Sequence, residues 1–270
     1  MSKIPSLSYL FTALLALYLY GCSASSSRSD NAGTGSSSQI KVGVVFDSGG
    51  IGDKSFNDSA NRGLQKAVTN FHITAKSIQS ASEKDYEGNL TAMADAGCQL
   101  IFAVGLNQAD ALKLVAPKYP TVDFAIVDGQ VAAPNVRSLN FSEEQGSFLA
   151  GYLAGLTTKT GKVGFVGGEE LDLIKKFYVG FEAGAITANP NVQVLPAKYV
   201  GDWDNVDIAH AEALQLFGSG ADIVYHAAGR AGLGVITAAK EQGKYAIGVD
   251  SDQDDVAPGT VLTSMVKQRG

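Results

Sequence analysis

The feature that most constrains the fold is a regular alternation of short β-type runs with longer stretches of helical periodicity. Strands are predicted at 40–46, 73–78, 100–104, 122–127, 136–140, 162–166, 192–199, 223–225, 245–249 and 261–266. Helices are predicted between them, at 56–70, 83–96, 108–116, 143–158, 171–188, 206–217 and 233–242. Such alternation is typical of parallel sheets with helices on both faces, so the sequence predicts an α/β protein.

The predicted strands divide near the middle of the chain into two doubly wound lobes joined by a hinge. We expect lobe 1 to comprise 39–141 together with 250–270, which would return into it, and lobe 2 to comprise 142–249. In open α/β sheets ligands bind beyond the carboxyl ends of the strands. Small and polar residues follow these ends, namely Asp47, Gly105, Asn107, Asp128, Gly167, Gly168, Gly229 and Asp250. They predict a cleft that faces a polar solute.

The first 38 residues predict a secretion signal and a flexible tether. Residues 1–21 carry one cation, Lys3, no acid, and an apolar stretch at 7–20, as expected of a secretory signal peptide. The string LYGC resembles a bacterial lipobox, in which Cys22 becomes lipidated, although Tyr20 stands where a small residue is usual. Residues 22–38 are rich in Ser, Gly and Ala, which predicts a flexible tether. The alternative is an uncleaved transmembrane anchor in which the cysteine is structural.

Charge and cysteine content exclude some classes of protein. The formal net charge of −6 argues against a nucleic-acid partner. Cys98 is the only cysteine besides Cys22, so no disulfide framework is expected, and it is predicted to pack as a small hydrophobe.

Two glycine-rich strings could suggest a nucleotide phosphate site, and neither has the required spacing. In GGIGDKSFN, Asp53 separates Gly52 from Lys54, whereas a phosphate-binding loop needs Gly-Lys-Ser in direct succession. GRAGLG at 229–234 lacks the dinucleotide-binding spacing. We interpret the first string as a loop that brings backbone close to a neutral ligand, with Ser55 as the helix N-cap.

Catalytic signals are weak, so we predict no enzymatic activity and no cofactor or metal. The three histidines, His72, His210 and His226, show no metal-ligand spacing. His226 stands near a strand end and is expected to support the site by hydrogen bonding. The acids at the strand tips leave a hydrolase as an enzymatic alternative.

Aromatic residues add a second clue to the ligand. Phe56 opens the first predicted helix, and Trp203 stands in the turn GDWDN. The flat face of Trp203 suits a base or sugar ring, and the alternative is that it holds the turn onto its own lobe. Phe177 is either a ligand contact or a helix core residue.

Five strings together resemble a known family: VGVVFDSGGIGDKSFNDSANRGL, GSFLAGYLAGLTTKTGKVGFVGG, FYVGFEAGA, VYHAAGRAGLGV and AIGVDSDQ. Over residues 40–269 the chain is similar to the basic membrane protein family of substrate-binding lipoproteins, and most closely to its purine-nucleoside receptor branch. The resemblance implies a type I periplasmic-binding fold, whose two lobes close over a nucleoside before it passes to an ATP-driven importer.

The same resemblance implies roles for individual residues. Phe56 and Trp203 would sandwich the purine, and Asn57 and Asp128 would bind its edge. Asp47 would line the same pocket. The ribose hydroxyls would be bound by Gly229, Asp250 and Lys267.

We therefore expect a monomeric, lipid-anchored, extracytoplasmic receptor at the cell membrane, whose partners are a purine nucleoside and the permease of an ABC importer. A receptor for a simple sugar such as ribose is the main alternative, followed by a surface adhesin or antigen and by a nucleoside hydrolase. Members of the family usually continue beyond the strand that carries Lys267. Because this sequence ends at Gly270, we expect either a fragment or a version without the closing elements.

Overall fold

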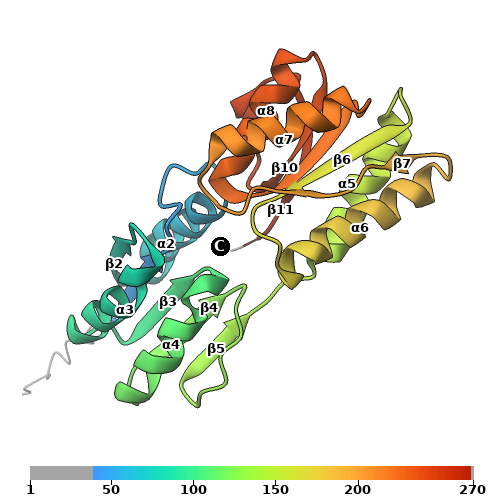
Figure 1. Ribbon diagram of the computed structural model, residues 1–270. Helices are drawn as coiled ribbons and strands as arrows, with labels where there is room; N and C mark the ends of the chain where they lie inside the picture. Colours follow the sequence, from blue (N-terminus) through green and yellow to red (C-terminus); the bar gives the residue numbers. More distant parts are fainter. Residues whose placement is uncertain (1–38, 269–270) are drawn as a thin grey trace, which may run out of the picture. The chain divides into compact units, whose positions relative to one another are not determined.

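The computed structural model describes residues 39–268 (Figure 1). The predictions of a signal peptide, of a lipidated Cys22 and of a tether at 22–38 lie outside the described residues. The described residues belong to one compact unit. No helix within 39–268 has both the length and the apolar character needed to cross a bilayer.

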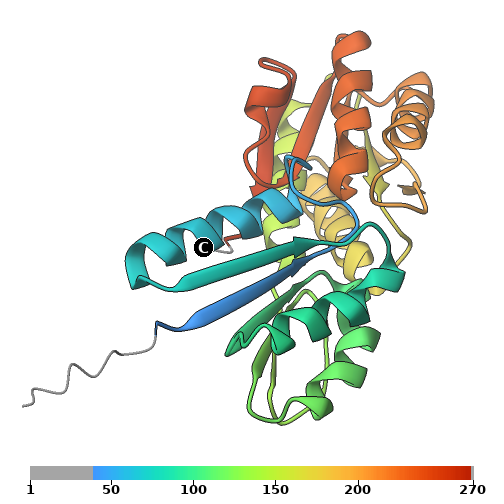
Figure 2. The same ribbon diagram turned by 90° about the vertical axis from the view of Figure 1, so that its left-hand side faces the viewer.

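The first lobe is built on a five-stranded parallel sheet in the order β2-β1-β3-β4-β5. Its strands are β1 (Lys41–Phe46), β2 (Thr74–Gln79), β3 (Leu100–Val104), β4 (Asp123–Val127) and β5 (Val136–Leu139). Helix α2 (Phe56–Phe71) lies on one face, and α3 (Tyr86–Asp95) and α4 (Ala109–Val115) cover the other (Figure 2). Alternate residues of a strand point to opposite faces, so Val44 packs in the cluster with α2 whereas Val45 packs in the cluster with α3 and α4.

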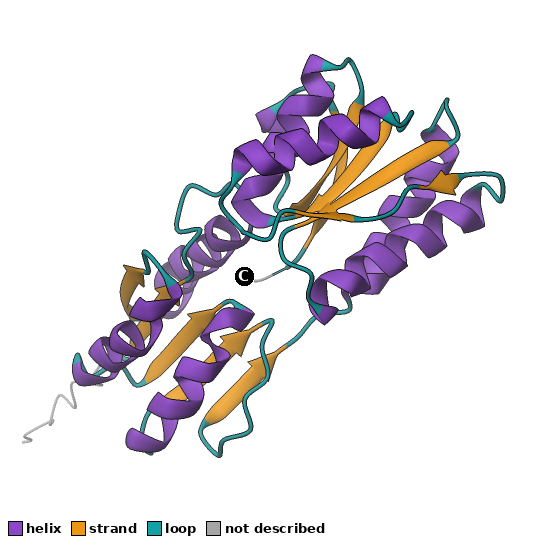
Figure 3. Cartoon of the chain, in the orientation of Figure 1, coloured by secondary structure: helices purple, strands orange, loops and turns teal. Residues whose placement is uncertain are grey.

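The second lobe is built on a six-stranded parallel sheet in the order β11-β10-β9-β6-β7, with β8 also pairing to β6. Its strands are β6 (Lys162–Gly167), β7 (Gln193–Val194), β8 (Lys198–Tyr199), β9 (Ile223–Ala227), β10 (Tyr245–Asp250) and β11 (Val261–Val266). One face is covered by α5 (Glu143–Thr157) and α6 (Asp172–Ala188), the other by α7 (Val206–Gly218) and α8 (Gly232–Glu241) (Figure 3). Both sheets confirm the predicted α/β class and most of the predicted strands and helices.

Helices α5 and α6 approach each other closely because glycines stand at their contact. A Cβ added at Gly184 would lie 1.9 Å from the carbonyl oxygen of Phe148, and one at Gly151 would lie 1.9 Å from that of Phe181. The backbones therefore pack where any larger side chain would separate them.

The strand predicted at 192–199 is wrong as a single element. It is divided into β7 and β8, which pair with β6 at Val194 and Lys198 respectively. Pro196 lies between them and has no backbone N–H to donate to the ladder.

The expectation that 250–270 returns into lobe 1 is also wrong for the strand that it contains. β11 pairs in parallel with β10, so it is the edge strand of the second sheet. Val261 and Met265 are buried in the two cores of the second lobe, which explains why the strand stays there. The segment still contacts the first lobe, through the loop between β10 and β11 at Ser55 and through Lys267, which lies just beyond β11 and binds Asp128.

Candidate functional site

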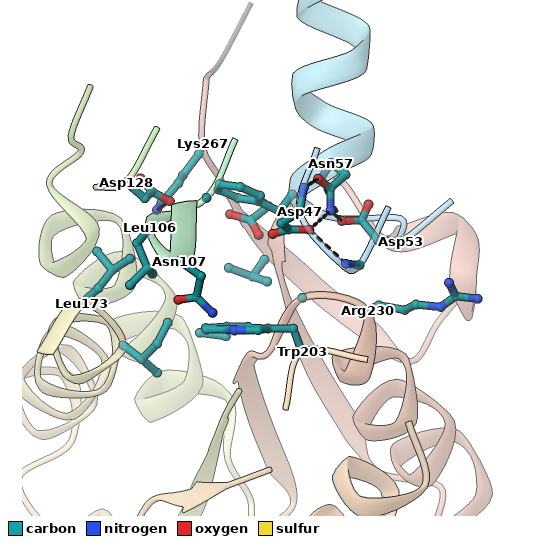
Figure 4. Close-up of a pocket in the computed structure, with 18 of the residues that line it drawn as sticks. Asp47, Asp53, Asn57, Leu106, Asn107, Asp128, Leu173, Trp203, Arg230 and Lys267 are labelled. Carbon is teal, nitrogen blue, oxygen red and sulfur yellow. Dashed lines mark hydrogen bonds and ion pairs between the residues drawn. The ribbon is translucent and has the colours of Figure 1, made fainter. Parts of the chain in front are cut away.

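One pocket is lined by residues from both lobes, mainly where strands end and loops begin (Figure 4). All nine predicted ligand-binding residues line it: Asp47, Phe56, Asn57, Asp128, Phe177, Trp203, Gly229, Asp250 and Lys267. Parallel strands bring their carboxyl ends to one edge of each sheet, and this explains why residues far apart in sequence meet here.

The loop between β1 and α2 is organised by Asp53, which is 1% exposed. Its carboxylate accepts hydrogen bonds from the backbone N–H groups of Ser55 at 2.9 Å, Asn57 at 2.7 Å and Asp58 at 3.0 Å. Asp53 thereby caps the first turn of α2 in place of Ser55, whose side chain makes no capping bond. The side chain of Asn57 also donates to Asp53, at 3.1 Å.

Asp47 receives two hydrogen bonds at the pocket wall. Asn57 Nδ2 donates to Asp47 Oδ1 at 2.6 Å and the Gly49 N–H donates to the same oxygen at 3.0 Å. Burial nevertheless raises the pKa of Asp47 to about 7, and the nearby carboxylates of Asp53 and Asp204 act in the same direction. Asp47 is therefore poised to exchange a proton near neutral pH.

Asp128 and Asp250 occupy equivalent positions at the tips of β4 and β10. Both have left-handed backbone conformations, with φ of 62° and 66°. Aspartate tolerates this region better than most residues. The two left-handed turns place one carboxylate from each lobe at the pocket. Asp250 Oδ2 also accepts a hydrogen bond from Ser55 Oγ at 2.9 Å.

A buried ion cluster joins the lobes at one side of the pocket. Lys267 Nζ lies 2.7 Å from Asp128 Oδ2 and 2.9 Å from Glu143 Oε1, and all three side chains are at most 4% exposed. The ammonium also lies 5.2 Å from the ring centroid of Phe141 and 4.9 Å from that of Phe177. Phe177 packs in the hydrophobic cluster beneath α5 and α6, which confirms it as a core residue. It also lines the pocket, and its contact with a ligand stays a prediction.

The ion pair places a constraint on the roles that the resemblance implies. Asp128 is assigned there to the base and Lys267 to the ribose, yet these side chains touch each other. The same part of a ligand would therefore lie next to both Asp128 and Lys267.

Trp203 lies flat against the second lobe. A Cβ on Gly168 would lie 2.5 Å from Trp203 Cε3, so the ring rests on the Gly168 backbone. Gly229, with φ of 56°, begins the short turn η4 (Gly229–Ala231) and would place a Cβ 3.7 Å from the same ring atom. The rings of Trp203 and Phe56 line one pocket from different lobes.

His226 lies outside the set of residues that line the pocket. It is fully buried, and its Nε2 donates to Gln253 Oε1 at 3.0 Å. Burial lowers the pKa of His226 to about 4, so the ring is neutral near pH 7. Gln253 in turn donates to the Lys54 carbonyl of the first lobe at 3.1 Å.

The sequence analysis missed several residues of the site. These are Asp53, Tyr86, Leu106, Glu143, Leu173 and Arg230, all of which line the pocket except Glu143, which binds Lys267. Glu143 starts α5 and resembles any acid in a first helical turn, so nothing local distinguishes it. Among residues 39–268 no group of three or more acidic, histidine or cysteine side chains is arranged to hold a metal ion.

The comparisons with known proteins agree on one family. The family model described as "ABC transporter substrate-binding protein PnrA-like" matches residues 40–270. Basic membrane protein A of Borreliella afzelii is 37% identical over 236 residues, which are 85% of this chain and 72% of that protein. A CD4+ T-cell-stimulating antigen of Listeria innocua is 39% identical over 250 residues, covering 88% of this chain and 70% of that protein.

Solved structures show the same fold. A solute-binding protein of an ABC transporter system from Aeropyrum pernix has a TM-score of 0.78 at 29% identity, covering 85% of this chain and 67% of that one. A periplasmic solute-binding protein from Actinobacillus succinogenes, solved with bound D-allose, has a TM-score of 0.63 at 14% identity over 78% of each chain, a likeness of fold alone. These neighbours have the type I periplasmic-binding fold that the resemblance implied. With a pocket between two such lobes and a family match across nearly all of the described residues, the chain belongs to the Bmp family of PnrA-like ABC transporter substrate-binding proteins.

Proposed function

We propose that this protein is a lipid-anchored, extracytoplasmic receptor that binds a purine nucleoside between its lobes and delivers it to an ABC importer. The observation that carries the proposal is the lining of the pocket. It combines aromatic rings from both lobes, Phe56 and Trp203, with carboxylates from both, Asp47 and Asp128 from the first and Asp250 from the second.

A nucleoside has the features that this lining can recognise. Its base presents two flat faces to aromatic rings, and stacking on such rings contributes roughly 1–3 kcal/mol per base. Its vicinal ribose hydroxyls suit a carboxylate, which accepts two hydrogen bonds at once. Lys267 keeps an N–H to offer alongside its two carboxylate partners.

Affinity measurements on two variants test the ligand. We expect Trp203→Ala and Asp250→Ala each to weaken purine-nucleoside binding by roughly 1–3 kcal/mol, through loss of a stacking face or a charge-assisted hydrogen bond. Titration calorimetry with adenosine, guanosine and inosine would measure the loss, with the free bases, ribose and D-allose as competing solutes.

Matched controls lie outside the pocket. Phe71 is 74% exposed at the end of α2, and Asp123 begins β4, at the opposite end of the strand from Asp128. Phe71→Ala and Asp123→Ala should leave affinity unchanged. Binding of ribose or D-allose without binding of any nucleoside would favour the sugar receptor and reject the proposal.

The anchor is tested separately. The LYGC string and the Ser-rich segment that follows support lipidation at Cys22. We expect Cys22→Ala to abolish incorporation of a labelled fatty acid and to move the protein from the membrane fraction to the soluble one. Labelling that persists in this variant would contradict lipidation at Cys22.

A further inference from the structure

Four side chains form a polar bridge between the lobes beside the stacking ring. Glu83 and Asn107 come from the first lobe, and Glu169 and Trp203 from the second. We call this set the cross-cleft bridge. Asn107 and Trp203 line the pocket, and Figure 4 shows the Asn107 amide next to the Trp203 ring.

The Asn107 amide joins two carboxylates of different lobes. Its Nδ2 donates to Glu83 Oε1 at 2.7 Å and to Glu169 Oε1 at 3.5 Å. Burial raises the pKa of Glu169; the hydrogen bond from Asn107 lowers it, and repulsion by Glu83 across the cleft raises it further. The amide therefore offsets a like-charge repulsion that would otherwise oppose approach of the lobes.

Glu169 also holds the indole. The Trp203 side chain is a hydrogen-bond partner of the Glu169 carboxylate, and indole can only donate. Gly168, directly before Glu169 in the chain, provides the flat surface beneath the ring. Two consecutive residues thus contact the indole, Gly168 beneath the ring and Glu169 as its hydrogen-bond partner.

We propose that Glu169 is a positioning residue, which orients Trp203 for stacking and links that orientation to lobe closure through Asn107. Gly168, Glu169 and Trp203 all belong to the second lobe. Glu169 gains its donor from the first lobe only when the lobes close and bring Asn107 within hydrogen-bond distance. The stacking surface is therefore completed by closure. The inference rests on the proposed function in taking the stacked ligand to be a purine nucleoside.

Fluorescence offers a direct test, because Trp203 is the only tryptophan in the chain. In the ligand-free protein, Glu169→Ala should shift the emission maximum and increase quenching by acrylamide, since the indole loses its acceptor. Glu169→Gln retains an acceptor oxygen and should resemble the wild type. Glu170→Ala is the matched control, because Glu170 is the next residue and its partner is Lys175, at 3.4 Å.

Binding measurements test the link to closure. We expect Glu169→Ala to weaken adenosine, guanosine or inosine binding by about tenfold and Glu169→Gln by no more than about threefold. Asn107→Ala should also weaken binding, and the double variant should lose less than the product of the two single losses. Glu83→Ala, which removes the repelling acid without touching Trp203, should leave ligand-free emission unchanged.

Two results would overturn the inference. One is ligand-free emission of Glu169→Ala indistinguishable from wild type and Glu170→Ala, and the other is fully multiplicative losses for Asn107 and Glu169. The ligand-free readout also separates this inference from the proposed function. If the wild type bound no nucleoside while Glu169→Ala still altered Trp203, the proposed function would fail and the positioning role would stand.

Discussion

At the scale of single residues, the acidic lining of the pocket has a consequence for stability. Asp47 has a pKa of about 7 in the folded protein, against 3.8 for an ordinary aspartate, and Asp53 is shifted in the same direction. Between these pH values the folded state holds a proton that the unfolded state has released. Stability from Asp47 is therefore lost as pH rises from about 4 to about 7, and stays constant above that window.

The substitution Asp47→Asn isolates this effect. Asparagine resembles the protonated carboxyl group, so the variant should gain unfolding free energy relative to wild type as pH rises from 4 to 8. Urea unfolding of the wild type and the variant at pH 4, 6 and 8 would measure the difference in their unfolding free energies. The contributions of Asp53 and of other titrating groups are common to both proteins and largely cancel in this difference. A stability difference that does not depend on pH would contradict a raised pKa at Asp47.

At the scale of secondary-structure elements, the α5–α6 contact depends on glycine. A Cβ at Gly184 would overlap the Phe148 carbonyl, so we expect Gly184→Ala to destabilise the protein by roughly 1–3 kcal/mol through overpacking. Gly88 lies within α3, and a Cβ added there would meet no neighbouring atom within 4 Å. Gly88→Ala should instead stabilise by roughly 0.4–1 kcal/mol, because alanine restricts the unfolded chain. Equal effects of the two substitutions in chemical denaturation would refute the close contact.

At the scale of the whole molecule, the Lys267 cluster ties β11 of the second lobe to β4 of the first and to the start of α5. Removing the cation leaves two carboxylates buried together. We therefore expect Lys267→Met to destabilise the protein by roughly 3–5 kcal/mol. Replacing both acids as well, by Asp128→Asn and Glu143→Gln, should restore most of the loss.

The exposed pair of Lys118 and Glu87 supplies the control for this prediction. Its atoms are 3.0 Å apart, but the side chains are 58% and 48% exposed. Solvent screens such a pair, so Lys118→Met should change stability by less than about 1 kcal/mol. Thermal unfolding of the variants would reveal the difference, and a loss for Lys267→Met as small as the control's would argue against a buried cluster.

Much of this architecture was predictable because it depends on local patterns. The β1 run from Lys41 to Phe46 is largely apolar and buried, and the sequence of α2 is amphipathic. The tips of strands were also predictable as site positions, since parallel strands end at one edge of a sheet. Asp47, Asp128 and Asp250 line the pocket for this reason.

Other features depend on partners that are distant in the sequence. Asp128 and Lys267 are 139 residues apart and meet only in the folded protein, and Glu143 shows no local sign of joining them. The assignment of β11 to the second sheet depends on where Val261 and Met265 find a core to fill. The division of 192–199 into two short strands follows from the proline at 196, whose effect depends on the pairing with β6.

The sequence by itself determined the α/β class, the positions of most helices and strands, and the residues at the strand tips, because periodicity and turn chemistry act over a few neighbouring residues. Only the tertiary structure decided which lobe holds β11, and that Glu143, Asp128 and Lys267 share one buried cluster. Those outcomes depend on burial and charge pairing between segments far apart in the chain, and no local pattern encodes the choice of partner.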